Sequence, residues 1–373
     1  AGVPPPGPFP DLPSYWRDAA AWLNGKAGRH MVLAVPGSKR GEYQWGRPLD
    51  EPMQMLLTAR WATHSNVPWG SAGLARLLQA IDERIANGTG SAGITLALRR
   101  IGVRYLLVRN DLARDTLGTA WPARVHQALE DSGGLRRVAE FGPFVGERSG
   151  GIASGWWDQP YRALEVYEVP DPAPVAAVLP AGAAVRAAGS PEGVLDLADA
   201  GVLTDDAPVL LGDDAGAPET LDARTVLTDT LRRRDLVYGD VRRSAGATLP
   251  AGEAARTTDL LDPNWSKAAA AARLLGVAAI TASSAASDVT APPAIREPGR
   301  QPYAAFDGDR RTSWRSDGWR GPVGEWLQVE VTAPTRLPYL EIAFERNLIG
   351  PAVTEIALET DAGTRRVAVL PTD

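Results

Sequence analysis

The stretch Leu96-Ala-Leu-Arg-Arg-Ile-Gly-Val-Arg-Tyr-Leu-Leu-Val108 decides the fold of the first two thirds of this chain. Its first half has a helical spacing of apolar residues, Gly102 ends the helix, and a buried-type strand follows over 103–108. The same order of helix, glycine and strand returns in Pro122–Asp131, Gly133-Gly134 and Ala163–Val169. Alternating helices and strands predict an α/β layered domain with a largely parallel sheet.

This α/β domain is expected over residues 11–245, with a possible break between two lobes near 170–178, where Pro and Ala are frequent. Upstream elements fit the same pattern. Ser14–Leu23 has the spacing of a short amphipathic helix, Met31–Val35 is apolar throughout like a buried strand, and Ala72–Ala86 is a second amphipathic helix. Further down the chain, Ser190-Pro191 is a typical helix start.

Composition limits the possible classes of protein. A chain of 373 residues exceeds one ordinary core and predicts roughly two or three domains. The net charge of -6 argues against a nucleic-acid binder, and the lack of cysteine excludes disulfides, thiolate metal sites and a cysteine nucleophile. Residues 1–10 read as a proline-rich linker, and the most apolar run, 268–282, is shorter than the ~20 residues of a bilayer span. The expectation is a soluble piece of a larger protein.

The last third of the chain has a different pattern. Residues 246–275 read as a connector, and 276–373 contain short alternating segments between turns. Predicted strands are Trp326–Val331, Tyr339–Phe344 and Glu355–Glu359, with a hairpin at Asp361-Ala-Gly363. These features predict a β-sandwich of antiparallel strands.

One loop of this module, Tyr303-Ala-Ala-Phe-Asp-Gly-Asp-Arg-Arg-Thr-Ser-Trp314, has the chemistry of a calcium site. Asp307 and Asp309 offer carboxylates two residues apart, Gly308 permits a sharp turn between them, and Thr312 offers a hydroxyl. Calcium prefers six to eight oxygen ligands, so two carboxylates are few for this ion. A solvated turn without metal is the alternative.

This loop, together with Gly324-Glu-Trp-Leu-Gln-Val-Glu330, resembles the discoidin (factor V/VIII type C) family and related sugar-binding jelly rolls. The resemblance implies a structural Ca²⁺ held by Asp307, Asp309, Thr312 and the carbonyl oxygen of Ala304. In that family an acidic residue near the C-terminus completes the site. The chain ends before the matching position, so the sandwich is expected to be incomplete at its C-terminus.

Sugar contacts are predicted on a neighbouring loop. Trp319 lies in a polar, glycine-rich loop with Asp317, Arg315 and Arg320 close in sequence. A loop tryptophan stacks on the apolar face of a sugar ring, and charged neighbours bind hydroxyl groups. A ring that only caps the module is the alternative. The remaining tryptophans of the module, 314 and 326, are expected in its core.

The α/β domain shows no catalytic signature. It has no Gly-x-Ser-x-Gly elbow, and Val35-Pro-Gly-Ser-Lys-Arg-Gly41 lacks the Gly-Lys-Ser/Thr ending of a phosphate loop.

Of three histidines, His126 is expected on a helix surface and His64 is the single candidate for a catalytic role. The irregular loop 41–52 is dense in Trp, Arg and carboxylates, which indicates either a functional loop or one docked on its neighbours; docking is favoured.

Five segments resemble the soluble part of actinobacterial α-(1→3)-arabinofuranosyltransferases, which are large membrane enzymes of cell-wall arabinan synthesis: Ser14–Ala20, Gly41–Pro52, Val67–Gly70, Gly102–Asp111 and Thr228–Arg234. The resemblance implies a polyprenyl-phosphate arabinose donor and an arabinogalactan or lipoarabinomannan acceptor. It also implies a membrane-embedded remainder that holds the catalytic centre, so no catalytic residue is transferred to this chain.

Two functions follow as hypotheses. The first is an extracytoplasmic, non-catalytic segment that binds or positions glycan for such an enzyme. The second is a stand-alone carbohydrate-binding or adhesion protein. A soluble hydrolase or nucleotide enzyme is a third, weaker reading, because the α/β domain lacks the necessary motif.

Overall fold

The computed structural model describes residues 11–65, 72–146, 160–204, 207–211, 224–228, 233–235, 245–248, 274–286, 300–308, 312–316, 323–344 and 353–369. The chain forms two compact units. The first comprises Ala1–Arg273 with Ala286–Gly299, and the second comprises Leu274–Ala285 with Arg300–Asp373. The predicted linker 1–10 lies outside the described residues, as does most of the predicted connector.

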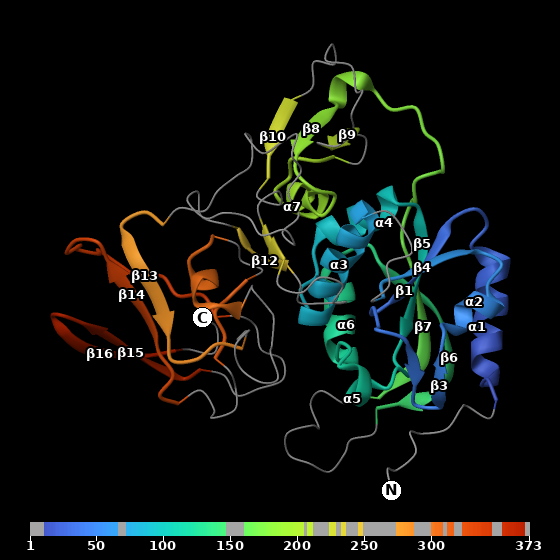
Figure 1. Ribbon diagram of the computed structural model, residues 1–373, viewed down its shortest axis with the longest axis horizontal. Coiled ribbons are helices and arrows are strands. Elements are labelled where there is room, and N and C mark those ends of the chain that lie inside the picture. The colour runs from blue at the N-terminus through green and yellow to red at the C-terminus, as the bar shows by residue number, and fades with distance from the viewer. Residues whose placement is uncertain are drawn as a thin grey trace, which may run out of the picture. The chain divides into compact units, whose positions relative to one another are not determined.

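A five-stranded sheet with the order β4-β1-β5-β7-β6 is the centre of the first unit (Figure 1). The strands β4 (Arg60–Thr63), β1 (Met31–Val35) and β5 (Val103–Arg109) run parallel to one another. The strands β7 (Tyr161–Glu168) and β6 (Arg136–Val145) continue the sheet in antiparallel pairing. The sheet is therefore mixed, where the sequence pattern predicts a largely parallel one.

The apolar run of β1 follows from burial on both faces of the sheet. Met31, Leu33 and Val35 join one hydrophobic cluster, while Val32 and Ala34 join another on the opposite face. All five residues are buried. Because side chains alternate along a strand, a strand buried on both faces needs apolar residues at every position.

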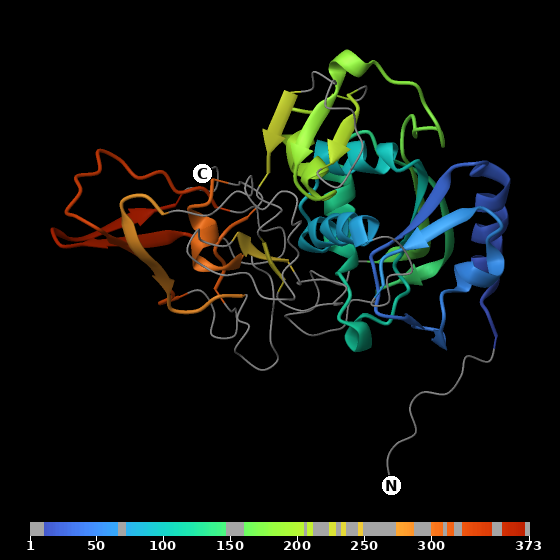
Figure 2. The same ribbon diagram turned by 45° about the horizontal axis from the view of Figure 1, so that its top comes forward.

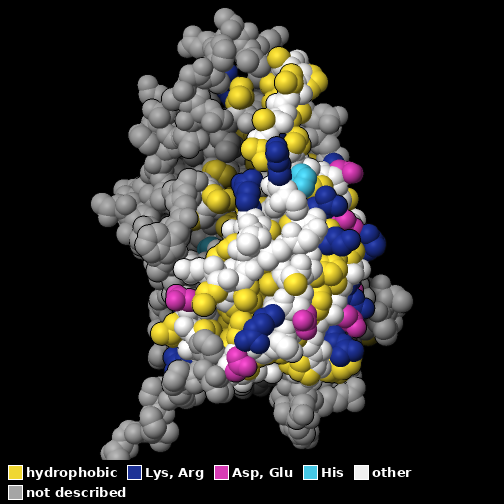
Figure 3. Space-filling view, turned by 90° about the vertical axis from the view of Figure 1, so that its right-hand side faces the viewer, with side chains coloured by type: hydrophobic (Ala, Val, Ile, Leu, Met, Phe, Trp, Pro, Cys, Tyr) yellow, Lys and Arg dark blue, Asp and Glu magenta, His cyan; other side chains and the backbone are white. Residues whose placement is uncertain are grey.

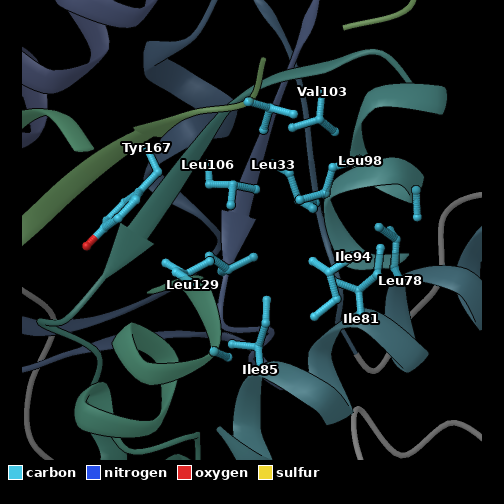
Figure 4. Close-up of a cluster of buried hydrophobic side chains, with 14 of the residues drawn as sticks. Leu33, Leu78, Ile81, Ile85, Ile94, Leu98, Val103, Leu106, Leu129 and Tyr167 are labelled. Carbon is cyan, nitrogen blue, oxygen red and sulfur yellow. The ribbon is translucent and has the colours of Figure 1, made fainter. Parts of the chain in front are cut away.

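Helices cover both faces of this sheet. On one face lie α3 (Ala72–Asn87), α4 (Ala92–Arg100) and α6 (Pro122–Asp131), whose apolar residues pack with Leu33 and Leu106 (Figure 4). The other face is covered by α1 (Ser14–Lys26) and the short α2 (Pro52–Leu56). The buried residues of α1 have the i, i+3, i+4, i+7 spacing of an amphipathic helix: Trp16, Ala19, Ala20 and Leu23. Figure 3, which views the molecule from the right-hand side of Figure 1, shows charges of both signs interspersed with apolar side chains.

A smaller parallel sheet with the order β10-β8-β9 completes the described α/β part. It contains β8 (Val185–Ala188), β9 (Val209–Leu211) and β10 (Arg224–Leu227), with α7 (Gly193–Asp199) between the first two. Figures 1 and 2 both show α7 beside α4. The other elements among the described residues of this unit are η1 (Ala181–Ala183), α5 (Arg114–Leu117), the hairpin of β2 (Gly41–Tyr43) and β3 (Gly46–Leu49), and the pair β11 (Arg233–Asp235) and β12 (Ala245–Thr248).

The second unit contains two antiparallel pairs and a short helix. β13 (Val277–Ala282) pairs with β14 (Leu327–Val331), and β15 (Glu355–Thr360) pairs with β16 (Gly363–Ala368) through the predicted hairpin. The helix is η5 (Pro302–Ala305). The strand expected over Tyr339–Phe344 is wrong: that segment is irregular, and both Tyr339 and Leu340 are exposed. The β-sandwich of discoidin type remains a prediction.

Candidate functional site

The parallel strands β4, β1 and β5 end at one edge of the sheet, and polar side chains gather there. β5 ends in Arg109, which is followed by Asn110 and Asp111, and β4 is followed by His64. All four residues are buried. In α/β sheets the carboxyl ends of parallel strands are the usual place for a ligand.

Arg109 lies in the middle of this edge with 2% of its surface exposed. Its guanidinium group binds Glu51 across 2.7 Å, and it donates to the carbonyl oxygen of Pro36 and to Thr63 Oγ1. Burial alone lowers the pKa of Arg109, but the charge of Glu51 outweighs burial and the pKa rises above its usual value. Arg109 therefore stays charged and fixes the 36–51 segment to the sheet.

Glu51 is the acceptor of this network. Besides Arg109, it accepts hydrogen bonds from Tyr43 Oη and from Ser38 Oγ, the latter at 3.1 Å. Burial raises the pKa of Glu51, but the Arg109 charge and these donors overcome that effect and hold the pKa below its usual value. The carboxylate is thus fully engaged by its own chain.

Asp111 lies beside this network and is surrounded by aromatic hydrogen-bond donors. Its Oδ2 accepts hydrogen bonds from Tyr15 Oη at 2.9 Å, Trp16 Nε1 at 3.0 Å and Trp45 Nε1 at 3.0 Å. The residue is 0% exposed, and its other oxygen, Oδ1, has no hydrogen-bond partner. Burial raises the pKa of Asp111 to about 6, and the three donors offset only part of that effect.

Ring contacts join these two groups into one cluster. Trp16 meets Tyr43 edge to face with centroids 5.3 Å apart, and Tyr43 stacks on Trp45 at 5.0 Å. Three segments distant in sequence, 14–16, 41–51 and 109–111, therefore share one buried polar core. The loop 41–52 is docked on the sheet, as the sequence reading favours, and its carboxylates Glu42 and Glu51 face inward, while Asp50 is exposed.

The backbone after β1, where the sequence lacks the ending of a phosphate loop, is bound to neighbouring segments of the chain. The amide of Gly37 donates to Asp82 Oδ1 at 2.9 Å, and the amide of Ser38 donates to the carbonyl oxygen of His64 at 3.1 Å. Arg40 and Arg47 both bind the buried Glu42, at 2.7 and 2.8 Å. These two amides and two guanidinium groups are therefore engaged by groups of the chain itself.

His126 differs from its sequence expectation. His126 is not on the surface: it is 5% exposed, lies 2.9 Å from Glu165, and stacks on Tyr161 with centroids 3.7 Å apart. The prediction is wrong because α6 turns this residue toward β7, where the buried Glu165 needs a partner. His64 is also buried, and its Nδ1 lies 2.9 Å from Asp82 Oδ2 on α3.

Two of the predicted calcium ligands lie together in the second unit. Thr312 Oγ1 donates to Asp307 Oδ2 at 2.7 Å, and Ala304 is buried in the adjoining η5. The calcium site itself stays a prediction. Asp309 falls outside the described residues. Among described residues, no group of three His, Cys, Asp or Glu side chains could hold a metal.

The predicted sugar-binding residues are described only in part. Arg315 lies in a segment that is bound to Arg300. The backbone amide of Arg315 donates to the carbonyl oxygen of Arg300 at 3.3 Å, and the guanidinium group of Arg300 donates to Ser313 Oγ at 2.8 Å. Asp317, Trp319 and Arg320 are outside the described residues. The other two tryptophans of this unit differ in their surroundings. The indole of Trp314 donates to the carbonyl oxygen of Ser284. Trp326 is 47% exposed, so the prediction that it lies in a core is wrong.

The model of the α-(1→3)-arabinofuranosyltransferase N-terminal GT-C domain family matches residues 1–261. The chain belongs to this family. The α-(1→3)-arabinofuranosyltransferase of Mycolicibacterium smegmatis is 33% identical to it over 391 residues, and that of Mycobacterium tuberculosis 34% over 377 residues. A cryo-EM structure of arabinofuranosyltransferase AftD from mycobacteria superposes with a TM-score of 0.62 at 31% identity and over 98% of this chain.

The chain spans a limited part of these arabinofuranosyltransferases. It covers 27% of each curated relative and 28% of the mycobacterial cryo-EM chain. In the part of the chain that the structure describes, no helix combines the length and the apolar character needed to cross a bilayer.

Family membership agrees with the sequence resemblance, and the geometry explains why its segments are distinctive. Segments 14–20, 41–52 and 102–111 supply the aromatic and charged residues of the buried cluster. Sequence reasoning missed that cluster, because the partners of Asp111 lie 66 to 96 positions away along the chain. The density of Trp and charge in 41–52 was the one available signal.

Proposed function

We propose that this chain is a non-catalytic, extracytoplasmic segment of an α-(1→3)-arabinofuranosyltransferase that binds and positions cell-wall arabinan. The observation that carries the proposal is the family match together with its extent. Nearly the whole chain aligns with each curated relative, but the aligned part is only about a quarter of that relative's length. The chain then acts beside a membrane-embedded remainder that takes arabinose from a polyprenyl-phosphate donor.

The state of the charged residues supports a positioning role rather than chemistry in the α/β unit. Arg109, Glu51 and Asp111 are 2%, 10% (side chain) and 0% exposed, and Arg109 and Glu51 form an ion pair with each other at 2.7 Å. A catalytic acid must reach a substrate atom within hydrogen-bond distance. Side chains held in this way instead stiffen the scaffold that carries the binding surfaces.

The second unit supplies the proposed glycan contacts. Arg315, with Asp317, Trp319 and Arg320, is the proposed sugar-binding loop, because rings and charged groups together recognise the apolar face and the hydroxyl groups of a sugar. A structural Ca²⁺ held by Asp307, Asp309, Thr312 and the carbonyl of Ala304 would stiffen the neighbouring loop. The proximity of Asp307 and Thr312 supports this ligand set.

Two assays test the proposal on this chain. Incubation with polyprenyl-phosphate arabinose and an arabinan acceptor is expected to give no transfer, whereas calorimetric titration with arabinofuranosyl oligosaccharides is expected to give binding. Trp319→Ala should weaken that binding, and Trp121→Ala in the first unit is its matched control. Robust arabinose transfer, or no glycan binding at all, would overturn the proposal.

A further inference from the structure

His64 and Asp82 form a dyad at the carboxyl end of β4 that the buried aromatic cluster does not use. Asp82 lies on α3 and is 2% exposed, and His64 is 7% exposed. The two side chains meet through His64 Nδ1 and Asp82 Oδ2 at 2.9 Å. The other carboxylate oxygen accepts the amide of Gly37 at 2.9 Å, so the carboxylate is fixed through both of its oxygens.

The dyad sets which ring nitrogen carries the proton. An ionised carboxylate accepts hydrogen bonds and cannot donate one, so the proton between the two groups belongs to His64 Nδ1. The neutral ring then has its lone pair on Nε2. Among the described residues, none hydrogen-bonds Nε2. The result is an oriented acceptor at an edge where α/β proteins bind ligands.

The surrounding backbone accommodates the dyad. A Cβ atom on Gly37 would lie 1.9 Å from Asp82 Oδ2 and 2.9 Å from the carbonyl oxygen of His64. A side chain at position 37 would therefore prevent the carboxylate from reaching both partners. The amide of Ser38 also holds the carbonyl of His64 at 3.1 Å, which fixes the backbone that carries the ring.

We infer that His64 and Asp82 form a binding site for a hydroxyl group of the glycan, with His64 Nε2 as the acceptor and Asp82 as the positioning residue. This inference rests on the proposed function, which supplies the glycan. The chemistry of the site narrows the ligand group, because an unprotonated imidazole nitrogen needs a donor and the donors of an arabinan are its hydroxyl groups. The site belongs to the first unit, whereas the proposed Trp319 loop belongs to the second.

The proton position is tested first, by nitrogen NMR of the ¹⁵N-labelled chain at about pH 8, where imidazoles are generally neutral. The His64 signals are identified by their loss in His64→Gln. We expect the proton on Nδ1 in the wild-type chain, and its transfer to Nε2 in Asp82→Asn, whose amide can donate to Nδ1. His30 and His126 serve as internal references. A wild-type proton on Nε2 would overturn the inference.

The ligand is tested by titration with a linear arabinofuranosyl hexasaccharide. We expect the His64 ring signals to shift, and the affinity to fall up to about tenfold in both Asp82→Asn and His64→Gln, since one hydrogen bond contributes ~0.5–1.5 kcal/mol. Asp50→Asn, a change of the same kind at an exposed position, is the matched control and should keep wild-type affinity.

The possible outcomes separate this inference from the proposed function. Binding that leaves the His64 signals unmoved would overturn the inference and leave glycan binding intact, with its site elsewhere. No binding by the wild-type chain would overturn both. A titration with glycerol at the same hydroxyl concentration tests whether any polyol would bind in the same way. If glycerol shifts the His64 signals as much as the hexasaccharide does, the glycan site is refuted.

Discussion

At the scale of single residues, Asp111 makes the most specific prediction because its pKa is raised. Its pKa is about 6 in the folded chain against an ordinary value of 3.8, so between these values the folded state binds more protons than the unfolded state. Stability from this group is therefore full below about pH 4 and falls as the pH rises through 6, by roughly 3 kcal/mol. Asp111→Asn should remove that dependence. Denaturant unfolding of both chains from pH 4 to 7 measures it, and an unchanged difference between the two across this range would contradict the assignment.

The buried ion pair of Arg109 and Glu51 predicts a loss of stability when one partner is neutralised. Glu51→Gln removes the negative partner and leaves the buried guanidinium uncompensated, which should cost about 3 kcal/mol of stability. Asp50→Asn removes a similar charge from the exposed neighbouring position and should cost less than about 0.5 kcal/mol. Chemical denaturation at pH 7 compares them. Equal losses in the two variants would show that the pair contributes nothing beyond a surface charge.

At the scale of elements, two helical glycines make a matched pair. A Cβ on Gly25, near the end of α1, would meet nothing within 4 Å, whereas one on Gly93, in α4, would lie 2.4 Å from the carbonyl oxygen of Leu195 on α7. Gly25→Ala should stabilise the chain by about 0.5–1 kcal/mol through helix propensity. Gly93→Ala should destabilise it by about 1–3 kcal/mol by separating α4 from α7. Thermal unfolding distinguishes the two, and a Gly93→Ala chain as stable as wild type would refute the close packing.

Elements with a strong local period are also where the sequence is most predictive. The helix expected over 72–86 and the strand over 31–35 are confirmed as α3 and β1, because α3 has apolar residues at a helical spacing and β1 is apolar at every position. The strands β6 and β4 were missed, since their residues are only partly buried and show no clean alternation. The candidate site was harder still. Local pattern cannot show that Asp82 reaches His64 and Gly37, because those contacts depend on how α3 lies on the sheet.

At the scale of the whole molecule, the two compact units predict separate responses to calcium. Ca²⁺ that binds only the folded second unit stabilises that unit by about 2.7 kcal/mol at a concentration 100 times its dissociation constant. The first unit should not respond, because Asp307 and Thr312 lie outside it. Calorimetric unfolding with Ca²⁺ or chelator should therefore move one transition and leave the other in place. Asp307→Ala should abolish the shift, while Asp361→Ala, an exposed acidic residue of the same unit in the hairpin turn, should retain it. If Asp307→Ala has no effect on thermal stability at any calcium concentration, the loop is a solvated turn and the proposed ligand set fails.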